Sequence, residues 1–361
     1  MINVTKTDLP PMEDYIQYLG QIWSSKWVTN DGELVKLLER RLMDYLNVKN
    51  LLLVSNGTSA LQIALKSFKI NGEVITTPFT FAATTNSILW ENLTPVFADI
   101  DPETYNIDPS DVEKKITKKT SAIIAVHVYG NPCYVDELQE IATNNGLTLI
   151  YDSAHAFGVK YNNKSVLNFG DLSTLSFHAT KTFNTAEGGA IVVKDDVIYE
   201  KIKLMRNHGI QSEERVVLPG INSKMNEFQA ALGLCNLEYV KDKIDQRKKI
   251  YECYKNKLEI LNEIKFQKIT ASCYNYAYMP VCFKDVETRD NIHSELTKNN
   301  INTRKYFFPL ITDFDYIKKE DFGLEIASNI SSRILCLPLY PDLKIGQVKK
   351  ITDIIIDNDQ M

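Results

Sequence analysis

Between residues 51 and 193, short apolar runs alternate with stretches that carry their apolar residues at helical spacing. Leu51–Val54 is predicted to be a strand and Thr58–Phe68 a helix, and further strands are predicted at Val74–Thr76, Ala122–Val126 and Thr148–Tyr151. Strands separated by helices form a mostly parallel sheet that is covered on both faces. The alternation therefore predicts an α/β fold built on a mostly parallel sheet.

After Val193 this alternation stops. Asn226–Tyr239 and Ile244–Leu258 are predicted to be two long helices, followed by strands at Tyr276–Cys282 and Arg333–Leu337. A chain of 361 residues is long enough for two domains. We predict a large α/β domain over residues 1–240, with an N-terminal helical segment, and a smaller α+β C-terminal domain over residues 241–361.

The net charge and the cysteine content limit the partners and the compartment that we expect for this protein. The net charge of −5 argues against nucleic acid or an anionic membrane as the main partner. The six cysteines contain no CxxC pair, which suits free thiols in a reducing compartment better than disulfides. The N-terminus has no signal pattern, and no long uncharged apolar run is present. We expect a soluble, cytoplasmic protein.

Ligands of an open parallel sheet bind at the carboxyl ends of its strands. The first such end is followed by Ser55-Asn-Gly-Thr-Ser-Ala-Leu61. Gly57, Thr58 and Ser59 at a helix start offer backbone amides, hydroxyls and the positive end of a dipole, which suit a phosphate. The alternative is an ordinary capped helix. Neither a P-loop nor a GxGxxG motif is present.

Two more strand ends carry chemically suggestive residues. Phe81 could stack on a planar ring, or it could be a core residue. Asp152 ends an apolar strand, where a carboxylate is costly unless paired, although a turn aspartate is the alternative. His155 has no second ligand at zinc spacing, so a hydrogen bond to a cofactor or a core position suits it better than a metal.

Lys181 lies between two apolar runs, at the end of Ser173–Phe177 and before Glu187-Gly-Gly189. A surface charge is the common reading of a single lysine. A lysine between two strands is also well placed for covalent work on a carbonyl, and glycines after it let other groups approach closely.

A single ligand would use all of these strand ends. A planar ring with a phosphate, an aldehyde and a ring nitrogen needs an anion cradle, a stacking face, a carboxylate and an amine. That ligand is pyridoxal phosphate (PLP). The sequence therefore predicts a PLP site and no metal site.

The chain resembles the DegT/DnrJ/EryC1/StrS family of sugar aminotransferases over essentially its whole length. The resemblance is carried by the motifs Ser55-Asn-Gly-Thr-Ser-Ala-Leu61, Pro78-Phe-Thr-Phe-Ala-Ala-Thr84, Val126-His-Val-Tyr-Gly130, Asp152-Ser-Ala-His155, Ser176-Phe-His-Ala-Thr-Lys181, Glu187-Gly-Gly-Ala190 and Asn222-Ser-Lys-Met-Asn-Glu-Phe-Gln-Ala-Ala231. It implies the fold type I PLP architecture and a homodimer with shared active sites. It also implies amination of a nucleotide-linked keto sugar with L-glutamate as the donor.

The resemblance also assigns roles to individual residues. Lys181 would form the Schiff base with PLP and act as the catalytic lysine, and Asp152 would pair with the pyridine nitrogen. Phe81 would stack on the ring, and His155 would lie near the ring hydroxyl.

At the phosphate end, the resemblance assigns Thr58, Ser59 and Ser176 to the cofactor of the same subunit. Asn222 would reach the phosphate of the partner subunit's cofactor, and a helix cap before Asn226 is its alternative role.

The substrate expected from the resemblance is a dTDP-sugar. Asn222-Ser-Lys224 and Trp23-Ser-Ser-Lys-Trp-Val-Thr-Asn30 are most similar to the branch that makes dTDP-4-amino-4,6-dideoxy-D-glucose from dTDP-4-keto-6-deoxy-D-glucose. Such a product would serve O-antigen or other cell-surface glycan biosynthesis. A 3-keto isomer and a galacto-configured product remain open alternatives.

Three rival classes remain. A sugar dehydratase of this fold would have histidine in place of Lys181, and a protein without turnover would lack the complete set of polar groups. An amino-acid aminotransferase would need an arginine clamp, for which Arg304 and Arg333 are candidates by residue type. Arg304, Lys305 and Tyr306 are also candidates for the sugar side of the site.

Overall fold

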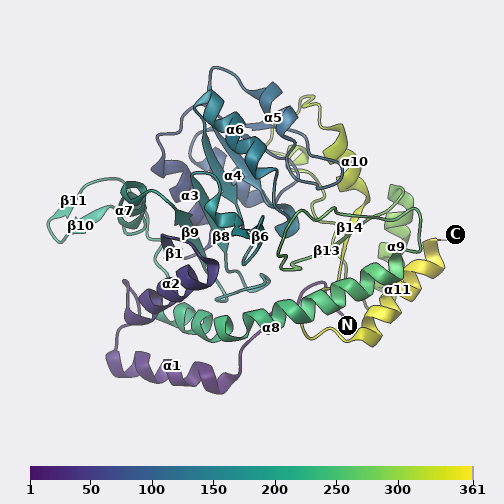
Figure 1. Ribbon diagram of the computed structural model, residues 1–361, viewed down its shortest axis with the longest axis horizontal. Coiled ribbons are helices and arrows are strands. Elements are labelled where there is room, and N and C mark those ends of the chain that lie inside the picture. Colours follow the sequence, from purple (N-terminus) through teal and green to yellow (C-terminus); the bar gives the residue numbers. More distant parts are fainter. Residues whose placement is uncertain (360–361) are drawn as a thin grey trace.

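A seven-stranded sheet forms the centre of the larger part of the computed structural model, which describes residues 1–359 (Figure 1). Across the sheet the strands are β1 (Leu51–Val54), β9 (Gly189–Val193), β8 (Leu172–Ser176), β5 (Thr148–Asp152), β4 (Thr120–Val126), β2 (Glu73–Thr76) and β3 (Thr94–Phe97). All neighbouring pairs from β8 to β3 are parallel, and β9 is antiparallel to both β1 and β8. The predicted α/β fold with a mostly parallel sheet is confirmed.

Helices cover both faces of this sheet, and strand β4 shows why its sequence is apolar throughout. The covering helices are α3 (Gly57–Ser67), α4 (Ala82–Trp90), α5 (Pro109–Lys115), α6 (Val135–Asn145) and α7 (Asp196–Met205). Ala122 and Ile124 of β4 join the core under α3 and α7. Ile123 and Ala125 join the opposite core, under α5 and α6. Because both faces of the sheet are buried, the residues of this strand that point to either face are apolar.

One continuous helix, α8 (Glu227–Leu258), replaces the two helices predicted between residues 226 and 258. The run between the two predicted helices, Val240-Lys-Asp-Lys243, contains neither proline nor glycine and lies on a helix of 32 residues. Asn226 caps the helix and exchanges hydrogen bonds with Gln229 in a capping box. The predicted domain boundary at residue 240 therefore falls inside a helix, and the division into domains stays a prediction.

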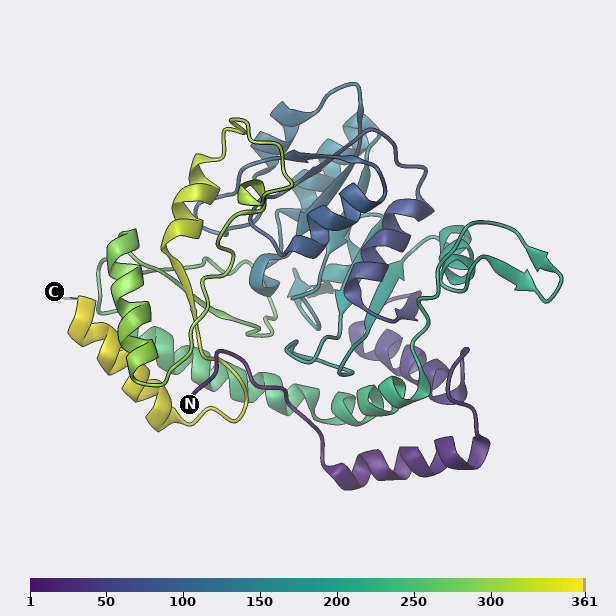
Figure 2. The same cartoon turned by 180° about the vertical axis from the view of Figure 1, so that it is seen from behind.

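The C-terminal part carries its own small sheet and core. Its antiparallel sheet is formed by β12 (Lys265–Phe266), β13 (Met279–Cys282) and β14 (Ile334–Leu337), and its helices are α9 (Val286–Lys298), α10 (Glu325–Arg333) and α11 (Ile345–Asp359). A shared core joins this part to the large sheet, with Phe79 and Tyr129 packed against Phe307. The N-terminal residue Ile2 pairs with Ile301, so the chain begins on the C-terminal part (Figure 2).

Helix α1 (Met12–Ser25) lies outside the main body and packs along α8, whereas α2 (Glu33–Leu46) is buried between α8 and the sheet edge (Figures 1 and 2). Trp23 of α1 meets Phe228 edge to face at 6.0 Å, and the Tyr239 hydroxyl donates to Asp14 at 2.6 Å. On α1, Met12 remains 71% exposed and Trp23 remains 68% exposed. Such a set of exposed apolar side chains is typical of a surface that another protein covers.

Short elements complete the described chain. They are the hairpins β6 (Lys160–Tyr161) with β7 (Lys164–Ser165) and β10 (Ile210–Ser212) with β11 (Arg215–Val216), and the 3-10 turns η1 (Val128–Gly130), η2 (Val166–Asn168) and η3 (Ile311–Asp313).

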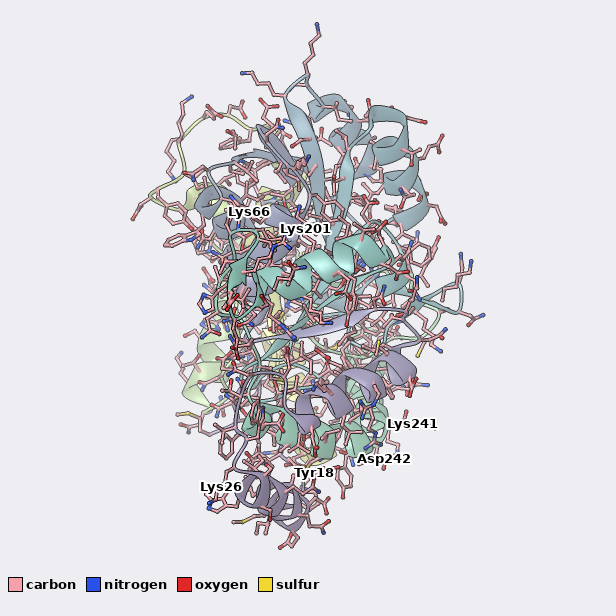
Figure 3. All side chains as sticks on the ribbon, turned by 90° about the vertical axis from the view of Figure 1, so that its left-hand side faces the viewer. Tyr18, Lys26, Lys66, Lys201, Lys241 and Asp242 are labelled. Atoms are coloured by element: carbon pink, nitrogen blue, oxygen red, sulfur yellow. The ribbon has the colours of Figure 1, made fainter. Side chains whose placement is uncertain are left out.

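Lys201 of α7 helps to fix α3 on the sheet. Its amine donates to the carbonyl oxygen of Ser67, at the C-terminus of α3, over 2.6 Å, and it lies near Lys66 on the face that Figure 3 shows. A cation at this end of a helix also complements the helix dipole. The opposite end of α3, where the dipole is positive, is thereby held at the carboxyl edge of the sheet.

No helix within residues 1–359 combines the length and the apolar content needed to cross a lipid bilayer.

Candidate active site

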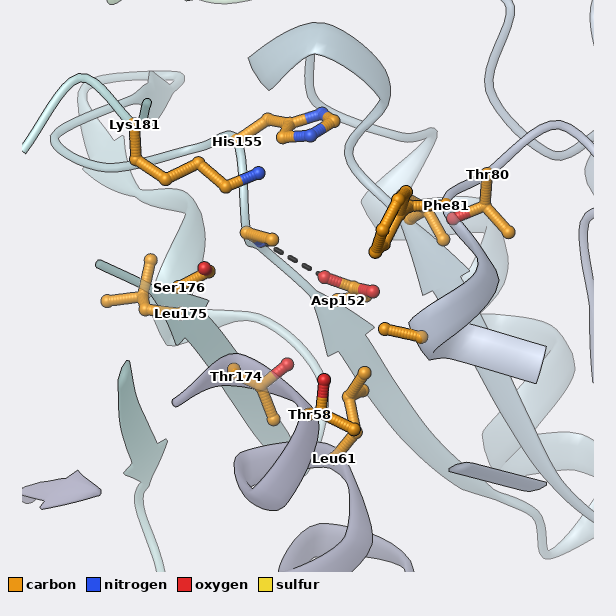
Figure 4. Close-up of a pocket in the computed structure, with 14 residues that line it drawn as sticks. Thr58, Leu61, Thr80, Phe81, Asp152, His155, Thr174, Leu175, Ser176 and Lys181 are labelled. Carbon is orange, nitrogen blue, oxygen red and sulfur yellow. Dashed lines mark hydrogen bonds between the residues drawn. The ribbon is translucent and has the colours of Figure 1, made fainter. Parts of the chain in front are cut away.

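A cavity opens at the carboxyl edge of the sheet (Figure 4). It is lined by residues in or after the carboxyl ends of five strands, β1, β2, β4, β5 and β8: Gly57, Thr58, Leu61, Thr80, Phe81, Ala83, Val126, Asp152, Ala154, His155, Thr174, Leu175, Ser176 and Lys181. Six of the eight predicted site residues lie in this lining, and Ser59 and Asn222 do not.

Lys181 is held by a folded loop between β8 and β9. The loop is closed by backbone hydrogen bonds from Phe177 to Gly188 and from Thr185 to Phe177, and the Lys181 amide donates to the His178 carbonyl. Phe183, two residues after the lysine, is buried and stacks on Phe157 at 4.6 Å. This aromatic anchor fixes the backbone, so the lysine side chain can extend into the cavity (Figure 4).

The amine of Lys181 is poised to lose its proton. Burial lowers the pKa of this amine to about 8, the nearby Asp152 carboxylate opposes the shift, and the positive charge of Arg304 adds to it. An amine with a pKa close to neutrality can both accept and donate a proton at working pH. The environment of Lys181 therefore suits a nucleophile that also acts as a base.

Asp152 ends strand β5 and presents a carboxylate to the cavity. It is only 6% exposed and accepts hydrogen bonds from the Thr84 hydroxyl at 2.8 Å and from the Ala154 amide at 3.1 Å. Burial raises the pKa of this carboxyl above its usual value, and these donors together with Lys181 act against the rise. A buried carboxylate with room for one more donor is suited to a protonated ring nitrogen.

His155 is buried on the other side of the lysine. Its Nδ1 accepts from the Tyr129 amide at 3.3 Å, and its Nε2 lies 3.3 Å from the hydroxyl of Tyr278. Burial lowers the pKa of this imidazole well below its usual value, and the charge of Lys181 lowers it further. Because Nδ1 of the neutral His155 accepts a hydrogen bond, the ring hydrogen is on Nε2.

The N-terminus of α3 forms the end of the cavity opposite His155. Asn56 caps the helix by accepting from the Ser59 amide at 2.8 Å, while the first amides of a helix have no partner within it. A Cβ added to Gly57 would lie 2.9 Å from the Cβ of Ser176, so glycine allows the helix start and the end of β8 to meet. Thr58 and Ser176 then place two hydroxyls beside the helix terminus, which is an anion-binding arrangement.

Ser59 takes a different place from the one predicted. Its hydroxyl donates to the Asn56 carbonyl at 2.9 Å and lies 2.6 Å from the Ser223 hydroxyl, away from the cavity lining. Consecutive helical residues point about 100° apart, and here Thr58 lines the cavity while the Ser59 hydroxyl meets Ser223. A phosphate contact by the Ser59 side chain stays a prediction without support from this geometry.

Asn222 also lies apart from the cavity of its own chain. It is exposed, pairs with Asn207 through a β-bridge, and its side-chain oxygen accepts from Lys224 at 2.8 Å. A role at a partner subunit's cofactor stays a prediction.

Phe81 lies at the mouth of the cavity. It immediately precedes α4, and 51% of its surface is exposed. An aromatic ring with one open face is available to stack on a planar ligand. The core alternative for Phe81 is therefore excluded by its exposure.

The two glycines after Glu187 serve the fold rather than an approaching ligand. A Cβ on Gly188 would lie 2.1 Å from the Thr185 hydroxyl, and one on Gly189 would lie 2.7 Å from the backbone of Asn56 and Leu175. The neighbours that come close are thus parts of the same chain. They bring β9, β8 and the start of α3 together.

Two residues were missed by the sequence analysis. Thr84 donates to Asp152, and it stands in the quoted Pro78–Thr84 motif, one helical turn after Phe81. Its position one helical turn after Phe81 could have identified it as a site residue from the sequence. Tyr278 contacts His155 from the C-terminal part of the chain, and no local pattern marks it.

The residues of the cavity fit pyridoxal phosphate. A buried carboxylate, an open aromatic face, an amine with a lowered pKa and a helix terminus with two hydroxyls surround one space. These are the four groups that the phosphate, ring, aldehyde and ring nitrogen require. Across residues 1–359, no group of three or more His, Cys, Asp or Glu residues is arranged to hold a metal ion.

Comparison with known proteins gives one consistent result. Residues 11–356 match the model of the DegT/DnrJ/EryC1/StrS aminotransferase family. The chain is 42% identical over 363 aligned residues to the dTDP-4-amino-4,6-dideoxy-D-glucose transaminase of Escherichia coli, with 98% of each chain covered.

Two solved structures share the fold over nearly the whole chain. DesI, determined in the presence of its TDP-sugar product, superposes with a TM-score of 0.94 at 31% identity, covering 99% of this chain and 93% of DesI. The ntda protein of Bacillus subtilis, with bound cofactor PMP, gives a TM-score of 0.90 at 25% identity, covering 97% and 82%.

Proposed function

Because this chain belongs to the DegT/DnrJ/EryC1/StrS aminotransferase family, we propose that it aminates C4 of dTDP-4-keto-6-deoxy-D-glucose. The product is dTDP-4-amino-4,6-dideoxy-D-glucose, and L-glutamate is the amino donor. The proposal rests on the observation that Lys181 and Asp152 line the same cavity. The chain is also 42% identical to a dTDP-4-amino-4,6-dideoxy-D-glucose transaminase.

The enzyme is a PLP-dependent aminotransferase. When bound, this cofactor provides a carbonyl that takes up the amino group and a ring that accepts electrons. All other tasks of the reaction fall to the chain itself, and four of them can be assigned to residues of the cavity.

Lys181 carries the first task. It holds the cofactor in the resting enzyme, and its freed Nζ then removes the proton from the α-carbon of the amino donor. In the second half of the reaction the same Nζ returns a proton to the sugar carbon. The lowered pKa of the amine supports this double role, because one group must act as base and as acid in turn.

Asp152 carries the second task, which is to keep a proton on the ring nitrogen. Its carboxylate is fixed by Thr84 and Ala154, so it needs no rearrangement as charge develops in the ring. Phe81 covers the ring face at the open side and limits access of water. Thr58, Ser176 and the α3 N-terminus hold the phosphate.

The active unit in this proposal is a homodimer. Support comes from the exposed apolar side chains of α1 and from the position of Asn222, which is exposed and removed from the cavity of its own chain. Asn222 then completes the phosphate site of the partner. All six cysteines are free, which supports the reducing cytoplasm as the expected location.

Product analysis tests the proposal directly. Holoenzyme is incubated with dTDP-4-keto-6-deoxy-D-glucose and L-glutamate, and the product sugar is identified by NMR. We expect an amine at C4 in the gluco configuration. An amine at C3, or the galacto configuration at C4, would move the enzyme to one of the two open alternatives, and preference for pyruvate as acceptor would reject a sugar substrate.

A further inference from the structure

A further anchor of the loop that holds Lys181 is the buried side chain of Asn184, three residues after the lysine. Its side-chain oxygen accepts from the Ala186 amide at 3.3 Å, and its backbone carbonyl accepts from the Asn236 side chain of α8 at 2.9 Å. Its side-chain nitrogen donates to the backbone carbonyl of Asp8 at 3.0 Å. This last bond connects the loop to a segment that lies 176 residues away in the sequence.

Residues 2–8 form an extended segment, here called the strap, that joins the C-terminal part to this loop. Ile2 makes two backbone hydrogen bonds of 2.8 Å to the residues on either side of Ile301. Two residues further on, the Val4 carbonyl accepts from the Leu339 amide at 3.1 Å, just after β14. The chain then runs along α8 toward α1 (Figure 2). The first half of the strap is therefore held by the C-terminal part.

Lys243 of α8 fixes the other end of the strap. Its amine forms a salt bridge of 2.8 Å with the Asp8 carboxylate, and the two side chains are only 22% and 18% exposed. Because the carboxylate is held, the backbone carbonyl of Asp8 is kept toward Asn184. In the middle of the strap, by contrast, Lys6 meets Asp342 between side chains that are each 58% exposed, where an ion pair contributes little.

The Lys181 loop lies where the large sheet and the C-terminal part meet. Thr180, Lys181 and Thr182 line a small second cavity together with Ala277 and Tyr278 of the C-terminal part. Lys181 also lines the cavity of the candidate active site, so it borders both spaces. A change in the packing of the C-terminal part would therefore move a wall next to the reacting amine. The strap ties the loop to the same part of the chain that forms this wall.

Proton transfer depends steeply on where the base lies, and a misplacement of about 1 Å can slow a reaction about 100-fold. We propose that Asn184 is a positioning residue for Lys181, and that the strap sets the position of the loop through the Asp8 carbonyl. The placement of the C-terminal part is thereby transmitted to the amine that moves the proton. This inference rests on the proposed function in assigning that step to Lys181, but it does not depend on which sugar is the acceptor.

Asn184→Asp separates the contact with the strap from the other contacts of this residue. The variant keeps an oxygen for the Ala186 amide and a backbone carbonyl for Asn236, but it lacks the donor to Asp8. Rapid mixing of holoenzyme with L-glutamate, followed by cofactor absorbance, measures the first half-reaction. The limiting rate should fall roughly 5- to 50-fold, whereas the Kd for L-glutamate should change by less than about threefold. An unchanged limiting rate, or a loss in Kd alone, would overturn the proposal.

Matched variants control for charge and folding. Asn184→Leu also lacks the donor but is neutral, so an effect seen only with Asn184→Asp would come from its buried charge and would reject the proposal. Lys243→Met loosens the strap from outside the loop and should slow the limiting rate about 2- to 10-fold. Lys6→Met removes the exposed ion pair of the same strap and should leave the rate near wild type. If the Asn184 variants do not fold, Lys243→Met and Lys6→Met decide the test, and equal rates for these two would overturn the proposal.

Hydrogen exchange in the cofactor-free protein, read by mass spectrometry, reports the loop without any substrate. Amides of residues 177–188 should exchange at least about fivefold faster in Asn184→Asp and Lys243→Met than in wild type, but not in Lys6→Met. Exchange in strand β4 should stay the same, which excludes a general loss of folding. Unchanged exchange of the loop in both variants would contradict the positioning role. A wild-type enzyme that reacts with glutamate but not with the dTDP-sugar would reject the proposed acceptor and leave Asn184 in its role.

Discussion

The two sides of the cavity are built in contrasting ways. The floor, made of Thr58, Asp152, Ser176 and Lys181, lies at the carboxyl ends of strands of the large sheet or in the segments that follow them. The other side, here called the rim, comes from the C-terminal part and consists of Tyr278, Arg304 and Tyr306. These residues contact one another, and Tyr278 contacts His155 of the cavity lining. In the proposed reaction the floor holds the groups that act on the cofactor, whereas the rim touches the cavity only through the contact of Tyr278 with His155. This difference predicts that floor substitutions lower both half-reactions, whereas rim substitutions discriminate between them.

The largest effect is expected at Lys181. Lys181→Ala removes the amine that moves the proton in both halves, so turnover should fall at least about 10³-fold. The protein should also lose the yellow colour of the bound cofactor, which absorbance spectroscopy checks. Transamination at the wild-type rate by this variant would contradict the assignment of the floor.

Lys181 should also lower the stability of the cofactor-free protein in a pH-dependent way. Burial lowers its pKa from 10.5 to about 8 on folding, so the unfolded chain binds more protons between these values and stability rises with pH there. Below pH 8 the buried, protonated amine lowers the unfolding free energy by the full amount, about 3 kcal/mol. Lys181→Met should therefore be more stable than wild type at pH 7, with the difference vanishing near pH 10.5.

Urea unfolding of the two cofactor-free proteins at pH 7 and pH 10 measures this difference. Tyrosines and other titrating groups are common to both proteins, so they cancel in the comparison. If the difference in unfolding free energy between the two proteins did not change with pH, folding would not lower the pKa of Lys181.

Asp152→Asn should slow both half-reactions by about 10²- to 10³-fold, because the amide cannot hold a proton on the ring nitrogen. The substitution preserves size, so cofactor binding should persist. Stopped-flow absorbance follows both halves in the same preparation. If Asp152→Asn slowed only one half-reaction, Asp152 would behave like a rim residue. The proposed difference between floor and rim would then be wrong.

The smallest effect is expected for Tyr278→Phe on the rim. The variant loses one neutral hydrogen bond to His155 but keeps the ring that supports Tyr306. A change of less than about fivefold in kcat/KM is expected. A loss comparable with that of Asp152→Asn would mean that the hydroxyl takes part in the chemistry.

The same contrast explains what could be predicted from the sequence. Floor residues stand directly after apolar runs, so Asp152 and Lys181 were found from local patterns, and the carboxyl ends of parallel strands bring them together. Tyr278 reaches His155 across 123 residues of chain, and no short-range pattern encodes that contact. Its identification required the packing of the two parts of the chain.

The differences from the expected structure also have local causes. Ser59 is grouped with Thr58 because both are hydroxyl residues at a helix start, but its hydroxyl contacts Asn56 and Ser223, and its contact with a phosphate stays a prediction. Two helices are predicted between residues 226 and 258, but the run between them, Val240-Lys-Asp-Lys243, contains no proline or glycine, and a single helix continues through it.

Helix α8 has a practical consequence for anyone who would take the protein apart. Its first turns complete the core around α2, and its last turns complete the core under α11, over a length of about 48 Å. Dividing the gene at residue 240 would give each fragment half of a helix and half of a buried surface. The two parts therefore share one cooperative unit, and expression of either alone should yield insoluble material even though each contains a sheet.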